Sequence, residues 1–509
     1  MNQLKIGAVL SYIAILITLI IAIIYTPIVI RMLGQSEYGL YSMIGSIAAY
    51  LSILDLGLGN TIIRYISRNR AIGSKEEEAK LNGMFLIIYS FIGVITLLIG
   101  FLIYQNIDNI FNGSLATDEI RKGKIMIIIL IFNFSLSFPL ATFGSIMQAY
   151  EKFILTKSIS IFRSLIIPVV TVPFLFYGYG AVSMVIISSV INISILLINV
   201  YYCIVKLNIR FQFSKIEFRF LKEIFVYSSF VFLAILVDQI NWSTGQLILG
   251  IFKGTNAVAI FAIALQFARL YLQLSSSISG LLLPKISMIV SKNESIFELS
   301  QLMIRYGRIQ FIILMFVSSG FILFGKEFIS FWAGKEYISS YYITLIIMLP
   351  ITIPLIQNTG IAILQAKNLQ GFRSLILVII ACFNILISLL LVGNYGGLGV
   401  AIGTGLSYLI GNGIIMNFYY NYKIKLNILL FWKNIIQIFI PVMYSLTIGF
   451  IVINVWKDND MFSIILKIII FSIIYIITMW FLAFNTYEKK MLGQTLNFFK
   501  KFNLIKKYL

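Results

Sequence analysis

The run AVLSYIAILITLIIAIIYTPIVI occupies residues 8–30 and carries no charged side chain. As a helix rising ~1.5 Å per residue, it is long enough to cross a hydrocarbon core of about 30 Å. Similar runs of about 20 residues recur along the whole chain. The first run is far longer than the apolar core of a signal peptide and lacks a small-residue cleavage site, so we expect a retained helix. This pattern predicts a polytopic α-helical membrane protein.

Composition supports the same class. Of the 509 residues 60% are hydrophobic and only 11% are charged, where a soluble domain carries roughly 25% charge. That excludes a cytoplasmic enzyme, a secreted domain and a disordered chain. The absence of histidine excludes His-based zinc sites, haem ligation and proton relays. Cys203 and Cys382 lie in apolar segments without a CxxC spacing, so we expect small buried residues and no cofactor.

The apolar runs between polar breaks predict about fourteen transmembrane helices. They lie at residues 8–30, 39–63, 81–104, 124–148, 158–178, 181–205, 224–250, 256–283, 306–331, 341–366, 374–393, 397–420, 434–456 and 462–484. No connecting loop is long enough to fold as a domain, because the longest, at 64–80 and 206–223, are amphipathic connectors. Any function must therefore lie between helices.

The basic residues predict the orientation. Net charge is +20, and with the N-terminus inside, about 29 of the 39 basic residues fall in cytoplasmic loops and about eight outside. We therefore expect both termini in the cytoplasm, an even number of spans, and charge that sets topology rather than binding nucleic acid. The basic tail at 485–509 is expected to rest on anionic lipid headgroups.

A weak internal repeat suggests two related halves. Gly34 and the segment 38–41 recur as Gly254 and the segment 258–261, and the turn at 178–182 recurs at 394–398. Each pair is six spans apart, which preserves orientation in the membrane. We expect two pseudo-symmetric six-helix lobes plus two C-terminal helices. The expected parts are an N-lobe at 1–205, a cytoplasmic connector at 206–223, a C-lobe at 224–420, two helices within 434–484 and the tail.

Three segments carry a family resemblance. They are LGQSEYGLY (33–41), LDLGLGN (54–60) followed by Arg64-Tyr65, and YGGLGVAIGT (395–404). The chain resembles bacterial polysaccharide repeat-unit flippases, the O-antigen and capsule branch of the multidrug/oligosaccharidyl-lipid/polysaccharide exporter superfamily. The likeness covers nearly the whole chain, since span number, loop lengths and repeat agree.

The resemblance implies an all-α MATE-like fold with two lobes in a V and alternating access. The implied cargo is an undecaprenyl-diphosphate-linked oligosaccharide of lipopolysaccharide or capsule synthesis, moved from the cytoplasmic to the outer leaflet of the bacterial inner (plasma) membrane. Membrane lipids are expected partners, and a polysaccharide polymerase and a chain-length regulator are further candidates. The resemblance implies no enzyme activity.

Charged residues at membrane depth are the candidate functional groups, because each costs about 2.5–3.5 kcal/mol to insert. Asp238 lies in the middle of the seventh span and Arg269 near the middle of the eighth, at similar depth. They could form a structural ion pair between the two helices. Alternatively, Arg269 faces a cavity and binds an anionic cargo, while Asp238 changes partner between states.

The spacing around Arg269 favours the cavity. Gln266, Arg269 and Gln273 fall at i, i+3 and i+7, which places one polar stripe on a single helix face. Glycan hydroxyls need such amide partners once water is displaced. Asn241 belongs to the polar segment around Asp238, and Trp242 beside it could stack on a sugar face.

Further candidates lie at the ends of spans. Arg64 is expected to bind the diphosphate at the cytoplasmic mouth, because guanidinium groups bind phosphate oxygens bidentately, although it could also be a snorkelling topology anchor. Arg305 and Arg308 are weaker candidates of the same kind. Arg31 lies near the outer face, as an interfacial anchor or a gating group. Asp55 and Asp238 are candidates for coupling to protons or sodium.

Two other functions remain open. One is an ion-coupled small-molecule (multidrug) exporter of the same superfamily, although Arg269 disfavours a cationic drug. The other is a peptidoglycan-precursor flippase, which the N-terminal motif fits less well. A polymerase or ligase would need a large outer loop that the sequence lacks, and no GxxxxGK[ST] motif for ATP is present.

Overall fold

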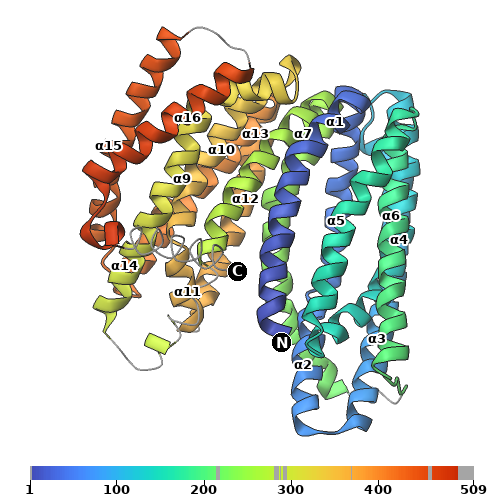
Figure 1. The fold of residues 1–509 in the computed structure, drawn as a ribbon. Helices are drawn as coiled ribbons and strands as arrows, with labels where there is room; N and C mark the ends of the chain where they lie inside the picture. The colour runs from blue at the N-terminus through green and yellow to red at the C-terminus, as the bar shows by residue number, and fades with distance from the viewer. Residues whose placement is uncertain are drawn as a thin grey trace, which may run out of the picture. The chain divides into compact units, whose positions relative to one another are not determined.

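The chain is a multi-pass α-helical membrane protein. The computed structural model describes residues 3–213, 218–279, 286, 288–290, 295–367, 369–456 and 461–490, and within these ranges all regular structure is helical (Figure 1). Twelve helical segments of the described chain are long and apolar enough to cross a membrane. The predicted all-α membrane fold is confirmed. Residues 491–509 of the predicted basic tail and 214–217 of the connector lie outside the described residues.

The described chain has twelve such segments where about fourteen spans were predicted. The numbers differ because two of the segments are long and each covers two predicted spans. Val9–Ala71 covers the predicted spans 8–30 and 39–63, and Ile235–Ser276 covers much of 224–250 and 256–283. Helix α1 (Gln3–Ser52) and helix α7 (Phe218–Ser279) each continue through a single non-helical glycine. The direction of the chain therefore changes without a loop.

The chain divides into two compact units. The first unit is Met1–Ala262 with Ile385–Val400, and the second is Ile263–Asn384 with Ala401–Leu509. The predicted lobes, 1–205 and 224–420, differ from these units because they place the segment 224–262 in the C-lobe. Which parts of the chain move together stays a prediction.

In the first unit, α1 packs against α5, while α4 packs against α3, α2 and α6 (Figure 1). After α1 come η1 (Ile53–Asp55), α2 (Leu58–Ile72), α3 (Lys75–Ile110), α4 (Thr117–Ala149), α5 (Phe153–Phe176), α6 (Gly180–Tyr201) and η2 (Tyr202–Lys206). Cys203 is buried in this core and its Sγ donates to the Phe143 carbonyl, as expected of a small buried residue. Cys382 is exposed, so the expectation of burial was wrong there, because α12 turns that face outward.

In the second unit, α9 packs against α10, α11, α15 and α16. The described helices beyond α7 are α9 (Ile296–Trp332), η3 (Lys335–Tyr337), α10 (Ser339–Ile356), α11 (Asn358–Ala366), α12 (Gln370–Tyr395), α13 (Gly397–Tyr408), η4 (Leu409–Ile415), α14 (Met416–Tyr422), α15 (Ile428–Val455), α16 (Met461–Thr478) and η5 (Met479–Ala483). Tyr271 on α7 bonds to Thr352 on α10 at 2.7 Å and accepts from Ser318 on α9 at 3.0 Å. These bonds tie the second stretch of α7 to the unit.

The internal repeat is visible in the backbone. Gly34 has φ 75° and ψ 172°, and Gly254 has φ 77° and ψ −176°. In the second pair, Gly180 and Gly396 have φ of 67° and 55° at the starts of α6 and α13. The matched positions therefore share conformations that side chains rarely adopt. This agreement supports the repeat that the glycine spacing predicts.

Replacing Gly34 with alanine should destabilise the protein through the backbone alone. No atom lies within 4 Å of an added Cβ there, but a residue other than glycine in this φ/ψ region costs about 1–3 kcal/mol. We expect Gly34→Ala to lower the melting temperature of the detergent-purified protein. Gly45→Ala is the matched control, because Gly45 lies in the same helix without positive φ or close neighbours. Equal melting temperatures for the two variants would contradict the prediction.

Candidate functional site

The second stretch of α7 carries a polar stripe that is open to its surroundings. Arg269 and Gln273 are exposed and Gln266 is half-buried, all on one side of the helix. On the other side, Ala268 and Tyr271 are buried against the second unit. The predicted grouping of Gln266, Arg269 and Gln273 on one accessible face is therefore present.

Apolar residues lie beside this stripe, also on the accessible side. Leu274 is exposed, and the half-buried Phe267 packs against the tilted rings of Phe321 and Trp332 at centroid distances of 5.5 and 5.4 Å. The accessible surface of the helix thus divides into a polar sector and an apolar sector. Exposing an arginine and two amides to lipid in the middle of a span is costly. The polar sector is therefore expected to face water.

The first stretch of α7 holds the other deep polar group. Asp238 is exposed, Trp242 is half-buried and Asn241 is buried. Asp238 belongs to the first unit and Arg269 to the second, so both their pairing and their cargo roles stay predictions. Asn241 has an exposed fraction of only 8%, which suits a packing role better than direct contact with a sugar.

Arg64 lies on the exposed face of α2. Asn60, Arg64 and Arg68 are exposed, whereas Ile62 and Tyr65 on the opposite face are buried in the core of the first unit. The helix is therefore amphipathic, with its cationic side accessible. Both the predicted phosphate contact and the alternative anchoring role require this exposure.

Asp55 lies at a break in the helix that the sequence analysis did not predict. Helix α1 ends at Ser52, and after η1 both Leu56 and Gly57 have positive φ, 53° and 70°. The Asp55 carboxylate accepts a hydrogen bond from the Tyr89 hydroxyl at 2.7 Å and lies against the backbone N–H groups of Gly57 and Gly59. Asp55 therefore lies at the start of α2, held by Tyr89, and its coupling role stays a prediction.

The remaining arginine candidates differ in their surroundings. Arg31 is exposed, one turn before Gly34. Arg305 is half-buried with its guanidinium over the Tyr487 ring, and it lines a cavity of about 590 Å³ together with Gln301 and Asn485. Among the described residues, no group of three or more His, Cys, Asp or Glu side chains is placed to hold a metal ion.

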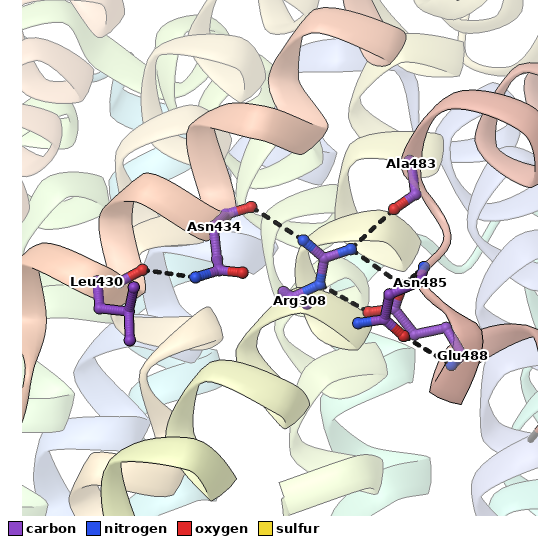
Figure 2. A network of polar contacts seen from close by, with 6 residues as sticks. All are labelled: Arg308, Leu430, Asn434, Ala483, Asn485 and Glu488. Atoms are coloured by element: carbon purple, nitrogen blue, oxygen red, sulfur yellow. Dashed lines mark hydrogen bonds and ion pairs between the residues drawn. The ribbon is translucent and has the colours of Figure 1, made fainter. Parts of the chain in front are cut away.

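Arg308 lies in a buried network of protein contacts. Its exposed fraction is 5%, and Figure 2 shows its guanidinium at the centre of a polar network. Nε and Nη2 donate to the two carboxylate oxygens of Glu488 at 2.7 and 3.0 Å. Nη2 also donates to the Ala483 carbonyl at 2.8 Å, and Nη1 to the Asn434 carbonyl at 3.2 Å. Protein groups thus accept from each of the three nitrogens, so a phosphate at Arg308 would have to compete with these bonds, and its predicted phosphate contact stays a prediction.

The Glu488 carboxylate is also held in place. It accepts from the Asn485 backbone N–H at 2.9 Å, while its own N–H donates to the Asn485 side chain at 2.8 Å. The network joins α9, α15 and the segment after η5 within the second unit. A buried charge pair needs such additional hydrogen bonds to offset its loss of hydration.

Breaking this pair should destabilise the protein strongly. We expect Arg308→Met to lower the free energy of unfolding by about 3–5 kcal/mol, because it leaves the Glu488 carboxylate buried and uncompensated. The double variant Arg308→Met/Glu488→Met should recover most of the loss, since no charge remains buried. Thermal unfolding in detergent measures both. Glu76→Gln, which removes the exposed pair with Lys80, is the control and should change nothing measurable. A double variant no better than the single one would contradict the prediction.

Some polar groups were not singled out from the sequence. Arg70 donates to the Ala149 carbonyl at 2.6 Å and lies over the Tyr150 ring, whose hydroxyl donates to Glu78. Burial and the hydrogen bond to Glu78 raise the pKa of Tyr150. Lys467 is buried in α16. Lys467 could have been found as a charge inside an apolar run, whereas the Arg70 cluster joins three distant segments and left no local signal.

Two solved structures define the class of fold. The lipid II flippase MurJ, in an inward closed conformation, matches over 93% of this chain and 98% of that chain, with a TM-score of 0.75 and 17% identity. An inward-facing multidrug resistance MATE family transporter of the MOP superfamily matches over 82% and 99%, with a TM-score of 0.63 and 16% identity. The chain therefore has the fold shared by these two membrane proteins.

Sequence comparison gives the family. The family model described as polysaccharide biosynthesis protein matches residues 4–290, more than half of the chain. An uncharacterized membrane protein of Bacillus subtilis (strain 168), EpsK, is 22% identical over 427 residues, which cover 80% of this chain and 81% of that protein. The chain belongs to the polysaccharide biosynthesis protein family. The resemblance drawn from the three sequence segments is confirmed.

Proposed function

We propose that the protein is a flippase that moves an undecaprenyl-diphosphate-linked oligosaccharide from the cytoplasmic to the outer leaflet by alternating access. The observation that carries the proposal is the accessible polar sector formed by Gln266, Arg269 and Gln273 in an apolar span. A cationic group flanked by amides suits a cargo that combines a diphosphate with sugar hydroxyls. Membership of a polysaccharide biosynthesis family and a fold like that of a lipid II flippase support the same class of cargo.

The exposed cationic face of α2 supports an entry site for this cargo. Arg64 and Arg68 lie on it together with Asn60, and the positive-inside pattern puts this end of the span at the cytoplasmic surface. A diphosphate made in the cytoplasm reaches the membrane there. The proposal includes both termini in the cytoplasm, an inner-membrane location and movement without chemical change of the cargo.

Removing the Arg269 charge should reduce transport. We expect Arg269→Ala to lower surface polysaccharide about tenfold or more in a strain that lacks its own repeat-unit flippase, because hydrogen bonds to a charged group are lost. Arg269→Lys should be intermediate, since it keeps the charge but not the planar fork. Arg210→Ala is the control, because Arg210 is exposed in the connector between spans. Full activity of Arg269→Ala at matched protein abundance would remove Arg269 from the site.

The same assay separates the proposed cargo from a peptidoglycan precursor. The wild-type protein should restore surface polysaccharide and should not rescue a strain depleted of its lipid II flippase. Rescue of the depleted strain alone would overturn the proposed cargo in favour of the precursor.

Ion coupling through Asp238 has its own test. The carboxylate is exposed in the middle of an apolar span, so it can exchange a proton or a cation with water. We expect Asp238→Asn to abolish the dependence of transport on a proton or sodium gradient, measured in membrane vesicles with imposed gradients. Unchanged ion dependence in this variant would exclude Asp238 as the coupling group.

A further inference from the structure

A carboxylate at one end of the first unit joins three helical segments. Glu119, in the first turn of α4, accepts hydrogen bonds from the hydroxyls of Ser36 on α1 and Thr255 on α7, the latter at 2.7 Å. Its second oxygen accepts from the Ala116 backbone N–H at 2.8 Å. The Ser36 and Thr255 hydroxyl oxygens are 3.3 Å apart. An ionised carboxylate only accepts hydrogen bonds, so both hydroxyls donate to it.

The two hydroxyl groups lie next to the matched glycines of the internal repeat, at positions that differ by one residue. Ser36 lies two residues after Gly34, and Thr255 lies directly after Gly254. Each therefore lies at the point where a long helix changes direction. Glu119 thus binds the two bends of the repeat to each other and to the start of α4.

Close backbone contact lies directly behind these hydrogen bonds. A Cβ added to Gly39 would come within 1.9 Å of the Thr255 carbonyl oxygen, and one added to Gly250 within 2.3 Å of the Met43 Sδ. Glycine at these positions lets α1 and α7 approach without a gap.

The contact continues along the two helices. Ser46 donates to Gln246, Tyr50 bonds to Thr244, and Thr61 on α2 bonds to Ser228 at 3.0 Å. On α1, Ser36, Gly39, Met43, Ser46 and Tyr50 follow one another at intervals of three and four residues, which places them on one helix face. The contact between α1 and α7 is thus close at the end near Glu119 and polar along its length.

We propose that Ser36, Glu119 and Thr255 form an outer latch, which holds α1 and α7 together in the state closed to the outside and opens to release cargo. This inference rests on the proposed function, and on the positive-inside orientation that places residues 31–38 and 253–256 outside. Glu119 is a positioning residue, because it acts by holding two helices rather than by touching cargo. Its contacts are hydroxyl–carboxylate bonds near the water-facing end, which water can replace when the helices part.

Labelling of a cysteine placed inward of the latch measures opening independently of cargo. Gln246 lies about 13 Å inward of Thr255 along α7, so Gln246→Cys reports access past the latch. In a Cys203→Ala/Cys382→Ser background, we expect Glu119→Ala to raise the rate of labelling by an impermeant maleimide added outside about tenfold, the change expected when a hydrogen bond to a charged group is lost. Asp118→Ala is the matched control, because Asp118 is exposed and contacts only Lys122 at 3.3 Å among the ion pairs of the described chain.

A disulfide across the latch tests the same idea in reverse. Oxidising Ser36→Cys/Thr255→Cys should block outside labelling at position 246 and abolish transport, and reductant should restore both. Ser137→Cys/Asn192→Cys is the control, because Ser137 and Asn192 are in contact at 2.8 Å between α4 and α6, away from the latch. That crosslink should leave transport unchanged.

The two measurements separate failure of the latch from failure of the proposed cargo. Equal labelling rates for Glu119→Ala and Asp118→Ala, or continued transport by the oxidised latch variant, would overturn the latch. Latch-dependent labelling in a protein that moves no lipid-linked oligosaccharide would support the latch and overturn the proposed function instead.

Discussion

The structure depends on one constraint: a charged group inside the membrane must be either hydrated or fully bonded to protein. Two arginines in the second unit meet it in opposite ways. Arg308 is buried, and its three guanidinium nitrogens donate to Glu488 and to two carbonyl oxygens. Arg269 is exposed beside two amides. The first arrangement joins α9, α15 and the segment after η5, whereas the second keeps a cationic side chain at the accessible surface. The proposed function follows from that difference.

The backbone also needs hydrogen-bond partners, and the single-glycine bends keep most of its groups within helices. A loop close to the membrane surface would need partners for its N–H and C=O groups, and a single-residue bend leaves few of these groups without helix hydrogen bonds. Helices α1 and α7 instead change direction within one residue, Gly34 or Gly254, and helix hydrogen bonding resumes at once. The break at Asp55 is different, because there the chain passes through a short 3-10 turn and two residues with positive φ before the next helix begins.

The sequence predicted what depends on local pattern. Hydrophobic length predicted the spans, glycine spacing predicted the repeat, and the i, i+3, i+7 spacing predicted the accessible stripe around Arg269. It did not predict contacts between distant segments. From the sequence, Arg308 looked available to bind phosphate. The carboxylate that it binds, Glu488, lies 180 positions away, so the local sequence gives no sign of it. From the sequence, Glu119 looked like any acidic residue in the first turn of a helix. Its partners Ser36 and Thr255 are distant in the sequence, and the fold brings them to it. A sequence shows which charged residues lie within an apolar span, but it does not show which distant residues bind them.

The strengths of the polar contacts also separate fixed parts of the molecule from movable ones. A buried Arg–Glu pair costs about 3–5 kcal/mol to break on one side, and an element held that way would rarely open. A transporter gate needs a smaller free-energy difference, because both of its states must be populated in each cycle, and a hydrogen bond to a charged group contributes only about 1.5–3 kcal/mol. The hydroxyl–carboxylate bonds of Glu119 suit that range, since water replaces them when they part. The Arg308 network therefore suits an element that stays fixed, and the Ser36–Glu119–Thr255 set suits an element that opens in each transport cycle.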